Sequence, residues 1–472
     1  MDALPTTVEE CHKIIKFLTD KFVEFEARYK KLEIENAQLK EQLNNNSSNS
    51  SKPPSSDFKK KKRQTNKKSS GKKSGGQKGH KGSFRVLLPT EEVDDIVTCK
   101  LPRHCSCGGK IKSTSEFMRH QVHELPVLEL NVTEYQLQKG FCSGCKLKHI
   151  SALPNGVTWG ITGSRLTSFM SELVAKYGLS RREQQRFLKE HFNFHISLGT
   201  VFNKQKIVNA AMETPVEELL PFIKQSHSAH ADETGHKRDG KNQWVWGFMS
   251  QAAAYFKIHA SRGIKALREM FGDFKNIVIT DRYAAYNIYD SSQRQICWAH
   301  IKRDFTKLSE KKDKPIARIG KNLLESQSSL FYLWHQYKDA KISKYTLQQE
   351  SEPIRKRIGE LLEQGSYTDP TLKAAGFCKN LLKVFNALWT FLEIDEIEPT
   401  NNHAERSIRP IVIWRKKYFG TRSDYGSQFV ARSASVNMTC KFQERNSFTY
   451  LCDLMKSYFA GEKAPSLLPS IG

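Results

Sequence analysis

Three acidic side chains, far apart in the sequence, stand where they could hold metal ions. Asp232 lies near the end of a strand-like segment, Asp281 directly follows a short apolar run, and Glu405 lies near the start of a helix-like segment. Magnesium and manganese prefer carboxylate oxygens, and two such ions about 3.5 to 4 Å apart can activate an attacking oxygen and stabilise a leaving one in a phosphodiester displacement. The three acids therefore predict metal-dependent chemistry on a nucleic acid. Attack by water would cut a strand, and attack by a 3′-hydroxyl would join two.

Each acid also has a purely structural interpretation. Asp232 could cap a turn, Asp281 could begin the following helix, and Glu405 could pair with Arg409 four residues further on. Taken singly, this interpretation is the stronger one. Glu233 competes with Asp232 for the metal role, but adjacent strand residues point to opposite faces, so both cannot face one site from a regular strand.

The segments around these acids predict one mixed sheet. SHSAHADET, NQWVWGFMS and AAYFKIHAS have the periodicity of three consecutive strands, GIKALREMFGDF that of a helix, and IVITD that of a short buried strand. A meander, a helix crossover and a parallel strand form the ribonuclease-H-like order. In that sheet Asp232 and Asp281 would lie side by side. The helix that carries Glu405, with Asn401 or Asn402 as its N-cap, would pack against them.

The chain between Asp281 and Glu405 is longer than such a core needs, and its pattern is helical, so we expect a helical insertion at about 304–395. Near its start, His300, Lys302 and Arg303 could contact phosphate groups. Trp298 and His300 could equally be packed residues, and we assign no catalytic role to His300.

Residues 8–43 carry apolar side chains at alternating steps of three and four, which is a heptad seam. Asn36 falls on this seam, where it could pair with its counterpart in a parallel dimer. The seam predicts self-association. The alternative is a single amphipathic helix docked on the catalytic body, because Phe22, Phe25 and Tyr29 are unusual in a tight dimer seam.

A formal net charge of +25 indicates a polyanionic partner, and nucleic acid is a simpler one than an anionic membrane surface. Residues 44–85 contribute strongly: twelve Lys or Arg lie from Lys59 to Arg85, with no carboxylate between Phe58 and Pro89. Such a segment cannot bury enough apolar area to fold alone. It predicts a disordered basic arm that meets DNA phosphates without reading sequence, and a solvated linker is the alternative.

Two close cysteine pairs flank the strand-like stretch EFMRHQVHELPVLELNVTEYQLQKGF. Cys105 and Cys107 form a CSC pair and Cys142 and Cys145 a CSGC pair, which together predict a zinc ribbon with a structural zinc. The first pair is one residue short of the usual spacing. It could still bind zinc, it could be helped by His104, or the site could have lost its metal.

Residues 160–220 predict a helical region. Within it, a break at Phe194–Ser197 separates two helices with the spacing of a helix-turn-helix, whose second helix would offer Thr200, Asn203, Lys204 and Lys206 to a DNA groove. An ordinary helical subdomain explains the pattern equally well.

The beginning of the sequence resembles no secretory signal, and no run of 18 apolar residues could span a bilayer, so we expect a cytoplasmic, nucleoid-associated protein. No adenine, flavin or other organic cofactor fingerprint is present. The expected cofactors are two magnesium or manganese ions and a structural zinc.

Eight motifs in order carry a family resemblance: NSSNSSKPPSSD, CSCGG, CSGC, HADETGH, WVWGF, VITDRYAAYN, CWAHIKRDF and NNHAERSIRPIVIWRKKYFG. Together they resemble the large transposase of the bacterial insertion-sequence family numbered sixty-six, over nearly the whole chain. The resemblance implies a DDE transposase with its acids at Asp232, Asp281 and Glu405. It also implies terminal inverted repeats, target DNA and small accessory proteins as partners. The shortened first cysteine pair departs from the family's pattern.

Two other functions are compatible with this sequence. A decayed relative could bind element ends without cutting them, and a nuclease or junction resolvase on the same core would use water only. All three acids are present, which disfavours the first. The dimerising seam and the several DNA-binding modules favour a synaptic complex, and a homo-oligomer, over the second.

The expected fold is multidomain α+β, with a mixed-sheet catalytic core and a helical insertion. Its parts are a coiled coil (8–43), a disordered basic arm (44–85), a zinc-ribbon-like module (86–155), a helical DNA-binding region (160–220), a ribonuclease-H-like catalytic domain (221–440) and a C-terminal tail (441–472). The expected DNA contacts are Lys59, Lys60, Lys61, Lys62, Arg63, Thr200, Asn203, Lys204, Arg409, Arg415, Lys416 and Lys417.

Overall fold

The computed structural model describes residues 7–46, 49, 79–82, 85–114, 117–368 and 373–469. It divides into two compact units. The larger comprises Met1–Phe58 and Thr133–Gly472, and the smaller is Lys59–Val132. No helix among the described residues is long and apolar enough to cross a membrane.

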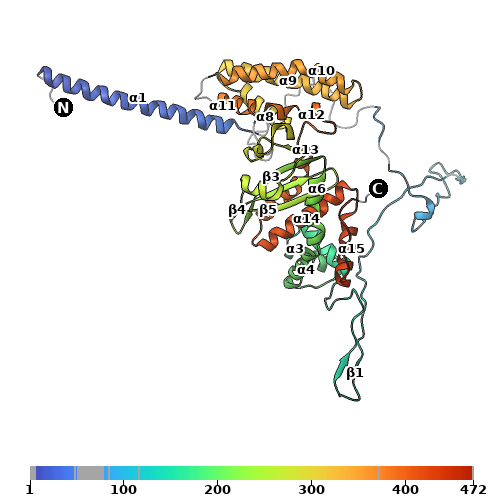
Figure 1. Cartoon of the computed structure of the whole chain (residues 1–472). Helices are drawn as coiled ribbons and strands as arrows, with labels where there is room; N and C mark the ends of the chain where they lie inside the picture. The colour runs from blue at the N-terminus through green and yellow to red at the C-terminus, as the bar shows by residue number, and fades with distance from the viewer. Residues whose placement is uncertain are drawn as a thin grey trace. The chain divides into compact units, whose positions relative to one another are not determined.

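A five-stranded mixed sheet lies at the centre of the larger unit (Figure 1). Its strands are β3 (Ser228–Arg238), β4 (Lys241–Met249), β5 (Ala254–His259), β6 (Ile277–Thr280) and β7 (Arg294–Ile296). They lie in the order β5-β4-β3-β6-β7. The first three strands form an antiparallel meander, and β6 and β7 run parallel to β3. Helix α7 (Ile264–Phe271) makes the crossover from β5 to β6. These strands and this helix lie at the predicted places, except β7, which the sequence did not predict. β3 continues to Arg238, through most of the predicted turn, so Asp232 lies within the strand and not near its end.

The two faces of the sheet are covered differently, because alternate residues of each strand point to opposite sides. Ala229 and Ala231 of β3 pack into the largest apolar core. Helix α7 contributes to this core, and so do the helices that precede the sheet and those that follow α13. On the other face, apolar residues of β4 and β5 pack against α13 (Asn402–Tyr418) and α14 (Asp424–Phe442). The face that carries His230, Asp232 and Thr234 is therefore the face covered by α13.

The segment between β7 and α13 is built of helices in its described residues, and Figure 1 shows them as a layer of their own. They are α8 (Trp298–Ser309), α9 (Lys314–Lys338), α10 (Lys344–Ser366), α11 (Lys373–Leu382) and α12 (Thr390–Glu393). Their core includes Leu323, Leu361 and Leu381 and continues into the sheet through Ile279 and Ile296. The insertion is thus joined to the sheet edge beside Asp281.

The helices that precede the sheet are packed with the C-terminal segment. They are α2 (Ser164–Ala175), α3 (Arg181–Phe192), α4 (Leu198–Ala211), α5 (Glu213–Glu217) and α6 (Leu219–Gln225). Residues 441–472, which we expected to form a tail, contain α15 (Ser447–Ala460), and its Leu454 and Met455 are buried in the same core as the sheet. The C-terminal segment is therefore part of the body.

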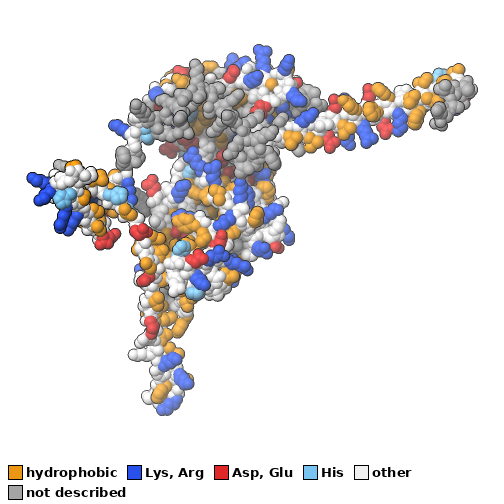
Figure 2. Space-filling model, turned by 180° about the vertical axis from the view of Figure 1, so that it is seen from behind, with side chains coloured by type: hydrophobic (Ala, Val, Ile, Leu, Met, Phe, Trp, Pro, Cys, Tyr) orange, Lys and Arg blue, Asp and Glu red, His pale blue; other side chains and the backbone are white. Residues whose placement is uncertain are grey.

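Helix α1 (Val8–Asn44) is one continuous helix over the predicted heptad segment. Its apolar side chains are largely exposed, with Leu18 at 58% and Phe22 at 63%. Figure 2 shows apolar side chains along its length, among basic and acidic ones. Docking of the seam on the catalytic body, the alternative to self-association, is therefore not what the described residues show.

The stretch that we expected to form strands before Cys142 is mostly irregular. Only Lys139–Phe141 forms a strand, β1, which pairs with β2 (Lys148–Ile150) in a short hairpin. Val127 and Val132 are about nine-tenths exposed, at 87% and 92%. The alternation predicted strands wrongly here because no described layer covers the apolar side chains of this stretch.

Candidate active site

Asp232 lies on β3, and Asp281 directly follows β6, the parallel neighbour of β3. In the pairing of β3 with β6, Ser228 is opposite Ile277 and His230 is opposite Ile279. Asp232 lies two residues beyond the last paired residue of β3, and Asp281 directly follows the end of β6, two residues beyond its partner Ile279. The Asp281 carboxylate is near enough to raise the pKa of Asp232. Asp232 is two residues from the paired His230, so it belongs to the face of the sheet that α13 covers, and Asp281 lies at the end of the neighbouring strand.

Asn401 fixes the start of α13 beside Asp232. Its side-chain Oδ1 accepts a hydrogen bond from Nδ1 of His230 at 2.9 Å, and its Nδ2 donates to the carbonyl of Ala231 at 2.9 Å. Asn401 is the N-cap residue, as predicted, but its side chain does not cap the helix. It bonds the His230 ring and the Ala231 carbonyl of β3 instead. The first turn of α13, which carries Glu405, is therefore held against the strand that carries Asp232.

The electrostatics of Asp232 reflect these neighbours. Burial raises its pKa well above the usual range of an aspartate, and the carboxylates of Glu233, Asp281 and Glu405 raise it further. The backbone N–H of Glu233, which donates to Asp232 Oδ1 at 2.9 Å, acts in the opposite direction. The three acids singled out from the sequence thus share one electrostatic neighbourhood.

A buried arginine supports the backbone at Asp281. Arg294, at the start of β7, is 1% exposed and donates to the Asp281 carbonyl at 2.8 Å and to the Thr280 hydroxyl at 2.9 Å. The Asp281 side chain accepts a hydrogen bond from the backbone N–H of Tyr283 at 2.8 Å. Sequence reasoning missed Arg294, because a cation inside a three-residue strand gives no apolar pattern.

Glu233 lies on the other face of the sheet and is occupied there. Arg262 donates to its Oε1 through Nε at 3.1 Å and through Nη2 at 2.7 Å, and the Tyr286 hydroxyl donates to its Oε2 at 2.6 Å. Burial, together with the nearby Asp281 carboxylate, raises the pKa of Glu233 to about 7 despite these bonds. Glu233 therefore has a structural network of its own.

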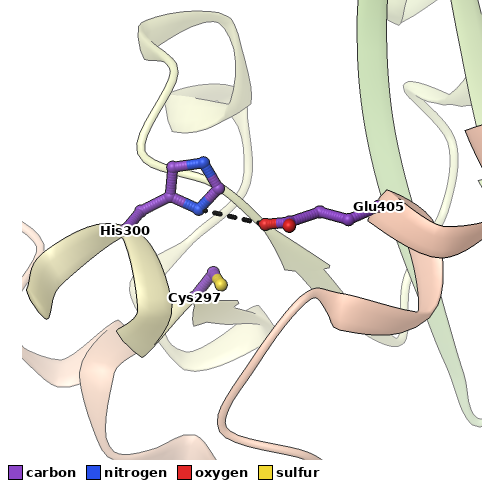
Figure 3. A group of neighbouring side chains, drawn as sticks. All are labelled: Cys297, His300 and Glu405. Atoms are coloured by element: carbon purple, nitrogen blue, oxygen red, sulfur yellow. Dashed lines mark ion pairs between the residues drawn. The ribbon is translucent and has the colours of Figure 1, made fainter. Parts of the chain in front are cut away.

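Helix α8 brings a histidine and an arginine to Glu405. Nδ1 of His300 and a guanidinium nitrogen of Arg303 each lie 3.6 Å from Oε1 of Glu405. Figure 3 shows Glu405 reaching from α13 toward the His300 ring, with Cys297 close to both. At 3.6 Å neither contact is a hydrogen bond, and Oε1 and Nδ1 are both buried without a hydrogen-bond partner among the described residues. Glu405 therefore pairs with His300 and Arg303 of α8. Among the residues that the structure describes, it forms no ion pair with Arg409.

Cys297, His300 and Glu405 offer ligand atoms within 4.8 Å of one another. Cys297 is fully buried, its sulfur accepts a hydrogen bond from the backbone N–H of Asn401 at 3.1 Å, and burial raises its pKa to about 11. A neutral thiol is a poor ligand for a hard cation. We therefore assign Cys297 to the packing between α8 and α13.

The predicted DNA contacts lie in different environments. Arg409, Lys416 and Lys417 of α13 are exposed, whereas Arg415 is half-buried and bonds the hydroxyl of Thr234 at 3.3 Å. In α4, Asn203 is exposed and Thr200 is half-buried, but Lys204 is 6% exposed and burial lowers its pKa. Lys204 is therefore not available to a DNA groove in this conformation. The predicted arm contacts Lys59, Lys60, Lys61, Lys62 and Arg63 lie outside the described residues.

The four cysteines of the predicted zinc ribbon lie in two tight turns. Cys142 and Cys145 occupy the turn of the β1–β2 hairpin, in the larger unit, and Cys105 and Cys107 lie in the smaller one. Hydrogen bonds from Cys107 and Ser106 lower the pKa of Cys105, and those from Cys145 and Gly144 lower the pKa of Cys142. Each turn thus favours the thiolate form that zinc binds.

Comparison with known families decides the relationship that these features suggest. The profile of the Transposase IS66 family matches residues 160–429, which is more than half of the chain and includes all three acids. The chain belongs to the IS66 transposase family. A second profile, of a family of unknown function (DUF6444), matches residues 3–85 and so covers α1 and the basic arm of this IS66 family member.

Curated relatives of this IS66 family member are uncharacterized. Protein y4hP of Sinorhizobium fredii is 21% identical over 414 residues, which cover 79% of this chain and 74% of y4hP. Protein y4qI of the same organism is 24% identical over 344 residues, or 65% of this chain. The match spans 62% of the length of y4qI. These relatives extend the family resemblance beyond residues 160–429 without adding an activity.

Proposed function

We propose that this chain is a DDE-type transposase with a ribonuclease-H-like catalytic core, and that Asp232, Asp281 and Glu405 are its catalytic acids. One observation carries the proposal: the β3–β6 register and the Asn401 anchor bring three acids from distant parts of the sequence to one face of one sheet. Fold alone does not establish activity, since this kind of sheet serves many chemistries. The donor set at the site does support one.

The residues fit two magnesium or manganese ions. The site offers carboxylate oxygens, the donors that these cations prefer. Burial and the neighbouring carboxylates raise the pKa of Asp232, an effect that a bound cation would oppose, and Glu405 Oε1 is buried without a hydrogen-bond partner in the described structure. When bound, such ions activate the attacking oxygen of a phosphodiester displacement and stabilise the leaving one.

The chain's own residues then have separate tasks. Asp232, Asp281 and Glu405 supply the ligand oxygens, and Arg294 and Asn401 hold the backbone that presents them. The exposed Arg409 and Lys416 follow Glu405 along α13 and would meet DNA phosphates. Lys417, the third predicted contact there, is exposed as well, but its ammonium donates to the Gly178 carbonyl and lies 3.7 Å from the Glu183 carboxylate. With DNA ends as substrate, water would serve as the nucleophile for cutting and a 3′-hydroxyl for joining.

The proposed partners are the element's terminal inverted repeats, target DNA, a second copy of the chain and small accessory proteins. Two alternatives remain as outcomes of the test: a relative that binds DNA without cutting, and a nuclease or resolvase that cuts without joining. The presence of all three acids at one site argues against the first. The unpartnered apolar seam of α1 argues for an assembly of copies, as synapsis of two ends requires.

The test is strand transfer with purified full-length protein, magnesium, a target plasmid and labelled duplexes taken from the DNA that flanks the gene. We expect joined products with the wild type and none with Asp232→Asn, Asp281→Asn or Glu405→Gln, while all three variants keep DNA binding. Because the acids act as a unit, the losses should not add in double variants. The matched controls are the exposed acids in Asp239→Asn and Glu217→Gln.

Each other result has a defined meaning. Cut products without joined ones identify a nuclease, and a bound complex with neither identifies an inactive relative. A single variant at Asp232, Asp281 or Glu405 that keeps near-wild-type strand transfer removes that residue from the site.

A further inference from the structure

The helical region exposes α3 rather than α4. The sequence suggested that α4 would enter a DNA groove, as the second helix of a helix-turn-helix does. In the structure α4 packs against α2, α3, α14 and α15, and its Val201, Lys204 and Val208 are buried. Asn203 and Lys206 form a narrow exposed edge. A surface for DNA in this region has to be sought on another element.

A groove of about 910 Å³ runs along α3 and the loop that leads into α4. Gln185 connects α3 to the loop before α4, because its side-chain nitrogen donates a hydrogen bond to the carbonyl of Ile196. The lining residues come from the outer side of α3 and from the first residues around α4: Arg182, Gln185, Arg186, Lys189, Glu190, His195, Ile196, Ser197 and Leu198.

Three cations form a row along this groove. Arg182, Arg186 and Lys189 are exposed and follow each other at steps of four and three residues, so they share one side of α3. Among the residues that the structure describes, none of the three has an ion pair or a hydrogen bond. Glu190 is the one acid on the groove wall, so the wall keeps an excess of positive charge.

The N-terminus of α4 adds a second, independent feature at the same groove. Ser197 accepts a hydrogen bond from the backbone N–H of Thr200 at 3.1 Å. The backbone N–H groups of Leu198 and Gly199 have no acceptor in the described part of the chain. Free N–H groups at the positive end of a 14-residue helix favour an anionic oxygen. Both features of the groove therefore favour the same chemistry, a phosphate group.

We propose that this groove binds the phosphate backbone of one DNA strand, through Arg182, Arg186 and Lys189 on α3 and the free N–H groups at the start of α4. The inference rests on the proposed function, since it names where the helical region meets the DNA that the acids cut. The row spans about 10 Å along the helix, which matches about three phosphates of one strand. Such contacts position the protein on DNA and do not read its sequence.

The test uses full-length protein, a fluorescent duplex of random sequence, a salt series and EDTA in place of magnesium. The variant Arg182→Gln/Arg186→Gln/Lys189→Gln removes three phosphate contacts, so the slope of log affinity against log salt should become less steep by about 2 to 3. Glutamine keeps the helix propensity, and the replaced side chains are exposed, so folding should be unchanged. The basic arm is the same in every variant, and its share of the slope cancels.

The matched control is Lys314→Gln/Arg318→Gln/Lys321→Gln on α9. These residues are also exposed, have the same spacing and lose the same charge, so this variant should change the slope by less than 1. Asn203→Ala/Lys206→Gln on α4 should leave affinity within about twofold, since these residues lie outside the groove.

Three results overturn the groove. They are an unchanged slope in the α3 variant, an equal change in the α9 control, and a larger loss in the α4 variant than in the α3 variant. The failure of the groove and that of the proposed function are distinguishable. If the wild type binds DNA and the α3 variant has the same salt slope, only the proposal for the groove is refuted. If the wild type binds DNA but transfers no strand, only the proposed catalytic function is refuted.

Discussion

Asp232 lies beside three other carboxyls, and its raised pKa means that the folded protein holds a proton there more tightly than the unfolded chain does. Glu233, with a pKa of about 7, behaves in the same way. A raised carboxyl pKa contributes stability below the ordinary value near 4, and this contribution is lost as pH rises through the folded value. The metal-free protein should therefore lose stability between about pH 4 and pH 7, and beyond that as Asp232 ionises.

Asp232→Asn should relieve this repulsion and raise the melting temperature of the metal-free protein at pH 8. We expect a gain on the order of 1 kcal/mol, or about 2–4 °C, together with loss of any stabilisation by magnesium. Differential scanning calorimetry in EDTA at pH 5 and pH 8, repeated with magnesium, measures both effects. Asp239→Asn, an exposed acid-to-amide change, is the control. A melting temperature at or below the wild-type value at pH 8 would contradict this account of the site.

His300 and Arg303 each lie 3.6 Å from one oxygen of Glu405. If Glu405 holds a metal ion as proposed, His300 and Arg303 are outer partners of a metal ligand, and losing such a partner commonly costs 10- to 100-fold in metal affinity or activity. We expect His300→Gln and Arg303→Gln each to raise the magnesium concentration needed for half-maximal strand transfer by about tenfold, and the double variant to show less than the product. Lys302→Gln, the exposed neighbour on α8, should leave that concentration unchanged. If all three variants lose only DNA affinity, His300 and Arg303 do not position Glu405.

At the scale of elements, the part of the fold that could be predicted from sequence is the part whose burial follows a simple period. Strands β3, β4 and β5 alternate, and β6 is a short apolar run, so their order and the positions of Asp232 on β3 and of Asp281 after β6 could be predicted. β7 was not, because its Arg294 is buried as a cation. The burial of α4 could not be predicted for a similar reason. Lys204 is a charged residue at a buried position, and a charged residue in a sequence predicts an exposed helix face.

The contacts that complete the site are of a different kind. Asn401 looked like a helix cap, and its bonds to His230 and Ala231 join residues about 170 positions apart in the sequence. His300 was weighed as a phosphate contact or a packed residue, and its approach to Glu405 depends on how α8 leaves the sheet. The backbone N–H of Cys297, just before α8, donates to the Thr280 carbonyl at 2.8 Å, next to Asp281. No period in a single sequence encodes such a contact.

Helix α1 is predicted to drive self-association. Its seam of large apolar side chains is exposed, which is costly for a lone helix and typical of an interface. Phe22→Glu should shift full-length protein from a multimer to a monomer in size-exclusion chromatography with light scattering. Val23→Glu, an equally exposed apolar residue just beside the seam, should not. Identical masses for wild type and both variants would mean that α1 does not drive self-association.

At the scale of the whole molecule, the sheet-containing body and residues 86–155 are held in place by different interactions. The sheet, the insertion and the C-terminal helix are held by continuous apolar cores. The described residues of 86–155 have little such core, and Val97, Phe117, Val127 and Val132 are all largely exposed. A module without a core needs another source of stability, and a structural metal is the usual one in small cysteine-containing modules.

Zinc is therefore the last expectation to test, in full-length protein purified under reducing conditions. If Cys105, Cys107, Cys142 and Cys145 bind it, metal analysis should give about one zinc per chain, which chelators and acid pH remove because each thiolate must stay deprotonated. Cys142→Ser should abolish binding, whereas Cys99→Ser, an exposed cysteine outside the two pairs, should keep it. If His104 replaces one thiolate of the shortened pair, one of Cys105→Ser and Cys107→Ser will also keep the metal. Wild-type protein without zinc, or Cys142→Ser protein that retains it, would show that residues 86–155 are ordered by other means, and the lowered pKa of Cys105 and Cys142 would then reflect turn geometry alone.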